Sequence, residues 1–112
     1  MGSEKHHGAV YLSADQLRCI HGILNRVIPH GQVRVFGSRA TGRARPFSDL
    51  DLLVTQPQRL SWTQRAELRE LFEASELPFR VDVVEADGLP PGMAARADDE
   101  SIALPAAAVA SR

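Results

Sequence analysis

The stretch VRVFGSRATGRARPFSDLDLLV, residues 33–54, determines how this chain is organised. It begins with an alternating apolar run, typical of a half-buried strand, that ends at Gly37 and Ser38. A basic loop follows, and Asp49 and Asp51 then open a second apolar run. A glycine turn close to two carboxylates indicates a site for a phosphate-bearing ligand and a cation.

The acid pair is the first part of this predicted site. Asp49 and Asp51 are two positions apart in an extended segment, so both side chains point to one face and Leu50 and Leu52 to the core. Neighbouring carboxylates repel each other, and such a pair persists mainly where a cation neutralises it. Mg²⁺ suits the pair because it takes oxygen ligands from carboxylates and substrate phosphates. Asp82, in a later apolar run, adds a third carboxylate, and the three acids could hold two ions for in-line phosphoryl displacement.

The glycine turn is the second part. A glycine turn that opens a helix presents backbone N–H groups to an anion, and Ser38 stands where a helix N-cap would be. Arginines in the following loop could balance the charge of bound phosphates: Arg39, Arg43 and Arg45. Taken singly, the acid pair is often a solvated turn and the arginines a solvated loop. Their occurrence together, with a distant acid on a later strand, favours the functional interpretation.

Helices and strands are predicted to alternate around this stretch. Apolar residues recur at helical spacing in 13–28 and 61–75, and both segments open with the Ser-x-x-Gln spacing of a capping box. We interpret Trp62 as a core anchor of the second helix. This pattern predicts an α/β (α+β) fold, in which helices pack on a small mixed β-sheet. The strands are predicted at 32–36, 51–54, 79–85 and 102–104, and a short helix at 93–100.

The composition is that of a single globular domain of 112 residues, with 44% apolar and 24% charged residues. We expect the domain at 13–104, between a flexible N-terminus at 1–12 and a loose tail at 105–112. A net charge of −1 argues against direct nucleic-acid binding. No apolar run approaches the ~20 residues of a membrane span, and no signal-peptide pattern opens the chain, so a cytoplasmic location is expected.

The motif resembles the signature of the DNA polymerase β-like nucleotidyltransferases, a GS turn followed by an acid-x-acid pair. The run GSRATGRARPFSDLDLLV is most similar to the minimal nucleotidyltransferases, whose pattern is GS-x-A-x-G, a short loop and SD-x-DL-x-V. The resemblance is strong over residues 33–54 and is supported by VDVVE at 81–85. It implies the nucleotidyltransferase fold, catalytic and metal-binding roles for Asp49, Asp51 and Asp82, and nucleotide binding by Gly37, Ser38, Arg39 and Ser48.

The resemblance also implies a function. Such domains use Mg²⁺ and a nucleoside triphosphate, commonly ATP, to transfer a nucleoside monophosphate to an acceptor hydroxyl. Many serve as antitoxins that adenylylate a tyrosine of a HEPN-domain ribonuclease toxin, so we expect a hetero-oligomer with such a toxin. Two alternatives stay open: a non-catalytic antitoxin that neutralises its toxin by contact, and a small-molecule nucleotidyltransferase of the aminoglycoside-modifying kind. The last is the least favoured, because those enzymes carry an additional domain.

Overall fold

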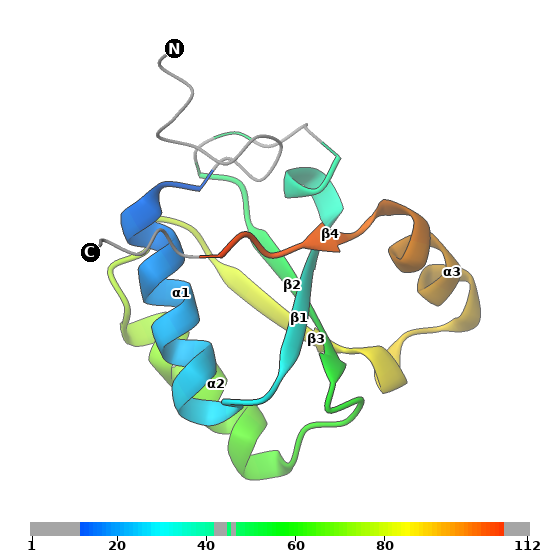
Figure 1. Ribbon diagram of the computed structural model, residues 1–112, viewed down its shortest axis with the longest axis horizontal. Coiled ribbons are helices and arrows are strands. Elements are labelled where there is room, and N and C mark those ends of the chain that lie inside the picture. The colour runs from blue at the N-terminus through cyan, green and yellow to red at the C-terminus, as the bar shows by residue number, and fades with distance from the viewer. Residues whose placement is uncertain (1–11, 42–44, 46, 107–112) are drawn as a thin grey trace.

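The computed structural model describes residues 12–41, 45 and 47–106, so all but the last residue of the expected flexible N-terminus and most of the expected tail lie outside the described residues. All the predicted helices and strands are present, with small shifts at their ends (Figure 1). Within the described residues, no helix combines the length and the apolar character needed to cross a membrane. In chain order the elements are α1 (Ala14–Val27), β1 (Gln32–Phe36), η3 (Gly37–Arg39), β2 (Leu50–Gln56), α2 (Trp62–Ala74), β3 (Val81–Glu85), η4 (Ala86–Gly88), α3 (Pro91–Glu100) and β4 (Ile102–Ala103).

Both long helices begin at the predicted capping boxes. At α1 the Gln16 backbone N–H donates to Ser13 Oγ over 3.1 Å, and the Ser13 N–H donates to Gln16 Oε1 over 2.9 Å. Leu12 precedes this cap and is buried in the core with Leu17, the arrangement of a hydrophobic staple. Leu12 therefore belongs to the folded domain, one residue before the expected boundary. The same reciprocal bonds start α2 at Ser61.

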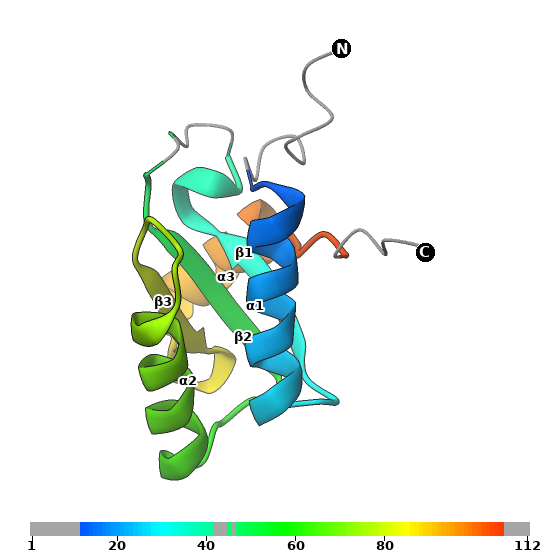
Figure 2. The same cartoon turned by 90° about the vertical axis from the view of Figure 1, so that its left-hand side faces the viewer.

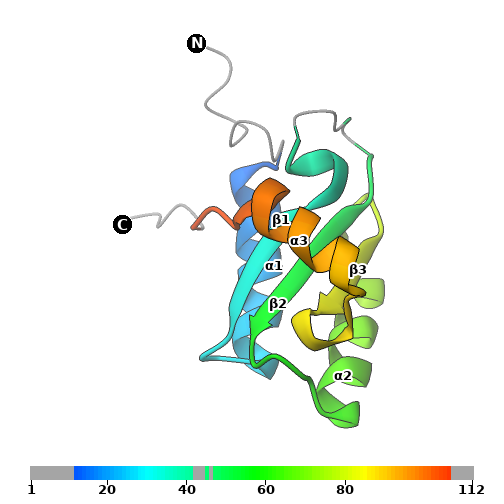
Figure 3. The same cartoon turned by 90° about the vertical axis from the view of Figure 1, so that its right-hand side faces the viewer.

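The four strands form one mixed sheet in the order β3-β2-β1-β4. β1 is antiparallel to β2 and β4, whereas β2 and β3 are parallel and are connected through α2. Helices α1 and α2 cover one face of the sheet (Figure 2), and α3 lies on the other (Figure 3). The core between the sheet and the two long helices is formed by Leu12, Leu17, Ile20, Leu24, Val27, Ile28, Val35, Leu50, Leu52, Val54, Leu60, Leu68 and Phe72.

Alternation along the strands sends polar side chains to the face that carries α3. Leu50 and Leu52 are fully buried beneath α1 and α2, so Asp51 between them projects to the opposite face. Arg34 in β1 is on that face too, where its Nε donates to Ser101 Oγ over 2.7 Å and its Nη2 to the Ser101 carbonyl over 2.8 Å. Ser101 is the C-cap of α3, so Arg34 ties this helix to the sheet.

The prediction that Trp62 anchors the core is wrong, because its side chain is 81% exposed. The buried residues of α2 are Leu68 and Phe72. Trp62 precedes them by six and ten residues, which rotates it by roughly 80–120° away from their stripe at about 100° per residue. Leu60, just before the N-cap, supplies the apolar contact at this end of the helix.

Candidate active site

The glycine turn is built against the carboxylate of Asp51. Gly37 has φ +76°, a conformation that favours glycine, and a Cβ at this position would overlap Asp51 Oδ2. The preceding residue, Phe36, pairs with Asp51 in the β1–β2 register, so the turn leaves β1 directly beside the acid. Ser38 does not have the predicted N-cap role, because η3 begins at Gly37 and Ser38 lies inside it. The Gly37 turn and Asp51 are thus one structural unit.

Two of the three acids are direct neighbours in the sheet. Asp51 and Asp82 are partners in the parallel β2–β3 register, so their side chains project from the same face. Asp49 precedes the first residue of β2 and is exposed. Partial burial raises the pKa of Asp51, and the negative charges of Asp82 and Asp49 raise it further, while Arg80 acts in the opposite direction. The raised pKa of Asp51 thus reflects its partial burial first and the two neighbouring negative charges second.

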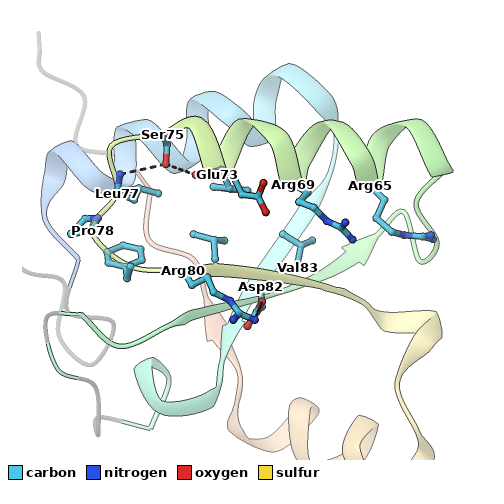
Figure 4. A pocket seen from close by; sticks show the side chains of 12 residues that line it. Arg65, Arg69, Glu73, Ser75, Leu77, Pro78, Arg80, Asp82 and Val83 are labelled. Atoms are coloured by element: carbon cyan, nitrogen blue, oxygen red, sulfur yellow. Dashed lines mark hydrogen bonds and ion pairs between the residues drawn. The ribbon is translucent and has the colours of Figure 1, made fainter.

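A cation from the chain itself contacts this group of acids. Arg80 Nη2 lies 3.2 Å from Asp82 Oδ1 at the start of β3 (Figure 4). The hydrogen bond to Asp82 and the charges of Asp82, Asp49 and Asp51 raise the pKa of Arg80 above its ordinary value. The Arg80 side chain is 75% exposed, so the ion pair stands at the surface of the site.

The loop before Asp49 is held from within the protein by Arg39. This side chain is completely buried, and its Nε and Nη2 donate to the Ser48 carbonyl over 3.1 and 2.6 Å. Its guanidinium carbon lies 4.3 Å from the centre of the Phe79 ring, within the range of a cation–π contact. Burial lowers the pKa of Arg39, and the charge of Asp49 opposes this effect. Arg39 therefore holds the backbone next to Asp49 from the protein interior and does not face solvent.

Ser48 has a similar structural task. Its hydroxyl accepts a hydrogen bond from the Arg45 backbone N–H over 2.8 Å, and its own N–H donates to the Arg45 carbonyl over 3.0 Å. These bonds close a turn directly before Asp49. Of the three loop arginines that were expected to balance phosphate charge, Arg43 lies outside the described residues.

The donor set fits Mg²⁺ bound together with a substrate. Within 12–41, 45 and 47–106, no group of three or more His, Cys, Asp and Glu side chains is arranged to hold a metal ion. Mg²⁺ is usually bound in proteins by one or two carboxylates, with the other positions filled by water and phosphate oxygens. Asp51 and Asp82 supply such a pair of hard oxygen donors, and their mutual repulsion is relieved by a cation.

A groove of about 840 Å³ lies along the open edge of the sheet, and Asp82 is the one acid of the three among its lining residues. It runs between α2 and β3, and its polar lining includes Arg65, Arg69, Arg80 and Asp82 (Figure 4). Arg65 and Arg69 project from α2 toward β3, while Arg80 and Asp82 lie on the other side of the strand. Asp82 is thus accessible from the β3 edge, on the side opposite to β1.

Sequence comparison identifies the family. The model of the nucleotidyltransferase domain matches residues 19–104, and the chain belongs to this family. A probable protein adenylyltransferase, MntA, of Haemophilus influenzae is 36% identical over 74 residues, which cover 66% of this chain and 65% of that protein. The chain thus spans just under two thirds of the length of this relative.

Two solved structures share the fold. One, assigned to the minimal nucleotidyltransferases, has a TM-score of 0.60 and 38% identity, over 81% of this chain and 95% of the other. The second belongs to a toxin–antitoxin structure with AMP-PNP; it has a TM-score of 0.64 and 26% identity, over 80% of this chain and 73% of the other. The predicted fold and the predicted resemblance to minimal nucleotidyltransferases are confirmed.

Proposed function

We propose that this chain is a Mg²⁺-dependent nucleotidyltransferase and an antitoxin, which transfers AMP from ATP to a tyrosine hydroxyl of a HEPN-family ribonuclease toxin. The observation that carries the proposal is the pairing of Asp51 with Asp82 beside the Gly37 turn. Carboxylates that repel one another gain most from a bound cation, and a glycine turn lets a phosphate approach the backbone. The similarity to an MntA adenylyltransferase supports the type of reaction.

The positions of the site residues suggest a separate role for each in binding the metal, binding the phosphates or positioning the loop. Asp51 and Asp82 would hold Mg²⁺, and Asp49 would join them in a two-ion site when the nucleotide is present. The bound ions would neutralise the triphosphate and make the acceptor hydroxyl more acidic. The backbone N–H groups of Gly37 and Ser38, with the Ser38 hydroxyl, would donate to phosphate oxygens. Arg39 and Ser48 would act as positioning residues, because their contacts fix the loop before the first acid.

The transfer is a displacement at the α-phosphorus of ATP. The acceptor oxygen forms a bond to this phosphorus, the bond from the phosphorus to the oxygen that bridges to the β-phosphate breaks, and pyrophosphate leaves. The hydroxyl proton passes to a carboxylate, and Asp82 is the candidate because it is on the open edge strand. An acceptor on another protein would approach Asp82 at the exposed β3 edge of the sheet.

The proposed acceptor is a toxin for two reasons. One structural neighbour is part of a toxin–antitoxin structure with AMP-PNP, and a relative carries the name of a protein adenylyltransferase. The test is incubation of the protein with MgCl₂, α-labelled ATP and the HEPN-family protein encoded nearest to it. We expect label on that partner, and we expect Asp51→Asn and Asp82→Asn each to reduce the label by at least about 100-fold.

Two controls separate transfer from simple contact. Arg59→Ala removes an exposed arginine that pairs with Asp87, away from the acid pair, and should leave the transfer unchanged. A variant that combines Asp49→Asn with Asp82→Asn should still fold but fail to neutralise the toxin. Full neutralisation by this double variant would support the alternative, a non-catalytic antitoxin that acts by direct contact.

A further inference from the structure

Arg80 completes a square of charged side chains on the face of the sheet that carries α3. Asp51 and Asp82 are register partners, as are Leu50 and Val81. The Leu50 backbone N–H donates to the Arg80 carbonyl over 2.8 Å, so the same register continues back to the preceding residues and places Arg80 beside Asp49. Residues two apart in extended strands share a face. One corner of the square is therefore a cation and three corners are acids.

Arg80 contacts one acid of the square and lies near the other two. It forms an ion pair with Asp82 and is influenced also by the charges of Asp49 and Asp51. The buried Arg39 differs, because it is enclosed between the Ser48 carbonyl and the Phe79 ring. Its guanidinium cannot move toward a ligand without breaking those contacts. Arg80 is thus placed to act as a movable cation.

The Arg80 contact is also weak enough to be exchanged. A single 3.2 Å contact links its Nη2 to Asp82 Oδ1, and the two side chains are 75% and 39% exposed. Arg59, which is 76% exposed, instead makes two shorter bonds to Asp87, of 2.9 and 2.6 Å. Exposed ion pairs contribute little to stability, and a divalent cation interacts more strongly with a carboxylate pair than one guanidinium does.

We propose that Arg80 is a displaceable counter-ion. In the metal-free protein its guanidinium neutralises Asp82. When Mg²⁺ and a nucleoside triphosphate bind together, Asp82 binds Mg²⁺ and the Arg80 guanidinium contacts phosphate oxygens of the nucleotide. This inference rests on the proposed function. Mg²⁺ alone must compete with Arg80 for Asp82, whereas Mg²⁺ with a triphosphate provides a new anionic partner for the released arginine. Arg80 thereby couples metal binding to nucleotide binding, and it is a positioning residue for the substrate.

The experiment compares Arg80→Ala with Arg59→Ala, a matched control of equal exposure and equal charge change. Calorimetric titration with MgCl₂ should show a dissociation constant about two- to fivefold lower for Arg80→Ala than for the wild type, because the competing cation is gone. In the presence of AMP-PNP this gain should vanish or reverse, since the arginine no longer contacts the phosphates. Arg59→Ala should follow the wild type in both titrations.

A second measurement needs no metal. In EDTA, Arg80→Ala should lower the melting temperature by a small amount, because the acids lose the counter-ion of an exposed ion pair, and it should have no such effect in a background that carries Asp82→Asn. Equal Mg²⁺ affinities of the wild type and Arg80→Ala, in a protein that binds Mg²⁺ with AMP-PNP, would overturn the counter-ion role alone. A wild-type protein that binds neither Mg²⁺ nor Mg²⁺ with AMP-PNP would overturn the proposed function as well.

Discussion

Replacement of Gly37 by alanine tests whether the turn and the acid site are one structural unit. The φ of +76° costs an L-residue about 1–2 kcal/mol. The new Cβ would also overlap Asp51 Oδ2 and lie 3.3 Å from Asp51 Cγ, so the carboxylate must leave its rotamer at a further cost of about 0.5–1.5 kcal/mol. The sum of about 1.5–3.5 kcal/mol corresponds to a fall in melting temperature of roughly 6–14 °C, at about 4 °C per kcal/mol for a domain of this size.

Thermal and urea unfolding followed by circular dichroism would measure this cost. The matched control is Gly22→Ala in α1, where a Cβ meets no atom within 4 Å, so we expect a gain of about 0.5–1 kcal/mol. Asp51→Ala separates the two parts of the Gly37 effect, because it removes the overlap and leaves the backbone strain. Gly37→Ala should therefore cost less in the Asp51→Ala background. An equal cost in both backgrounds, or no cost at all, would refute the reasoning.

Three further predictions concern charged groups, and each is checked by the melting temperature. Arg39→Ala should destabilise the protein by about 3 kcal/mol, because it orphans a carbonyl and leaves a cavity, and Arg39→Lys should restore only part of this. Glu85→Gln should cost about 0.5–1.5 kcal/mol at neutral pH. Burial tends to raise the pKa of Glu85, but bonds from the Leu60 N–H and Arg65 lower it overall, so the wild type should lose this stability as the pH falls below 4.5 and the variant should not. Asp51→Asn should raise the melting temperature of the metal-free protein at pH 7; because the pKa of Asp51 is raised, this gain should shrink as the pH falls and the wild-type carboxyl protonates.

Most local signals in the sequence were reliable, and the predicted N-cap role of Ser38 was the exception. The capping boxes at Ser13 and Ser61 predicted the starts of both long helices, because the bonds join residues three positions apart. The strand at 32–36 has the predicted ends, and Gly37 has the left-handed conformation that a sharp turn requires. The prediction that Trp62 is buried failed because the side of a helix that faces the core depends on how the helix packs against the sheet.

For the candidate site, the sequence supplied the chemical groups but not their partners. It identified three acids and showed that Asp49 and Asp51 share a face, since alternation along one strand is a property of the chain alone. Only the parallel pairing of β2 with β3 decided that Asp82 stands beside Asp51. The burial of Arg39 likewise depends on a distant aromatic ring, at Phe79, and no local pattern predicts it.

The sequence alone therefore determined the elements, the turn and the residue types of a nucleotidyltransferase domain, because propensity, capping and alternation act over a few residues. The tertiary structure decided which charged side chains lie close together, and so placed Arg80 beside Asp82. Arg80 stands two residues before Asp82 in the sequence, but no sequence pattern singled it out, because its role depends on the register of a neighbouring strand. The interaction of charges depends on distances in space, which sequence separation does not set.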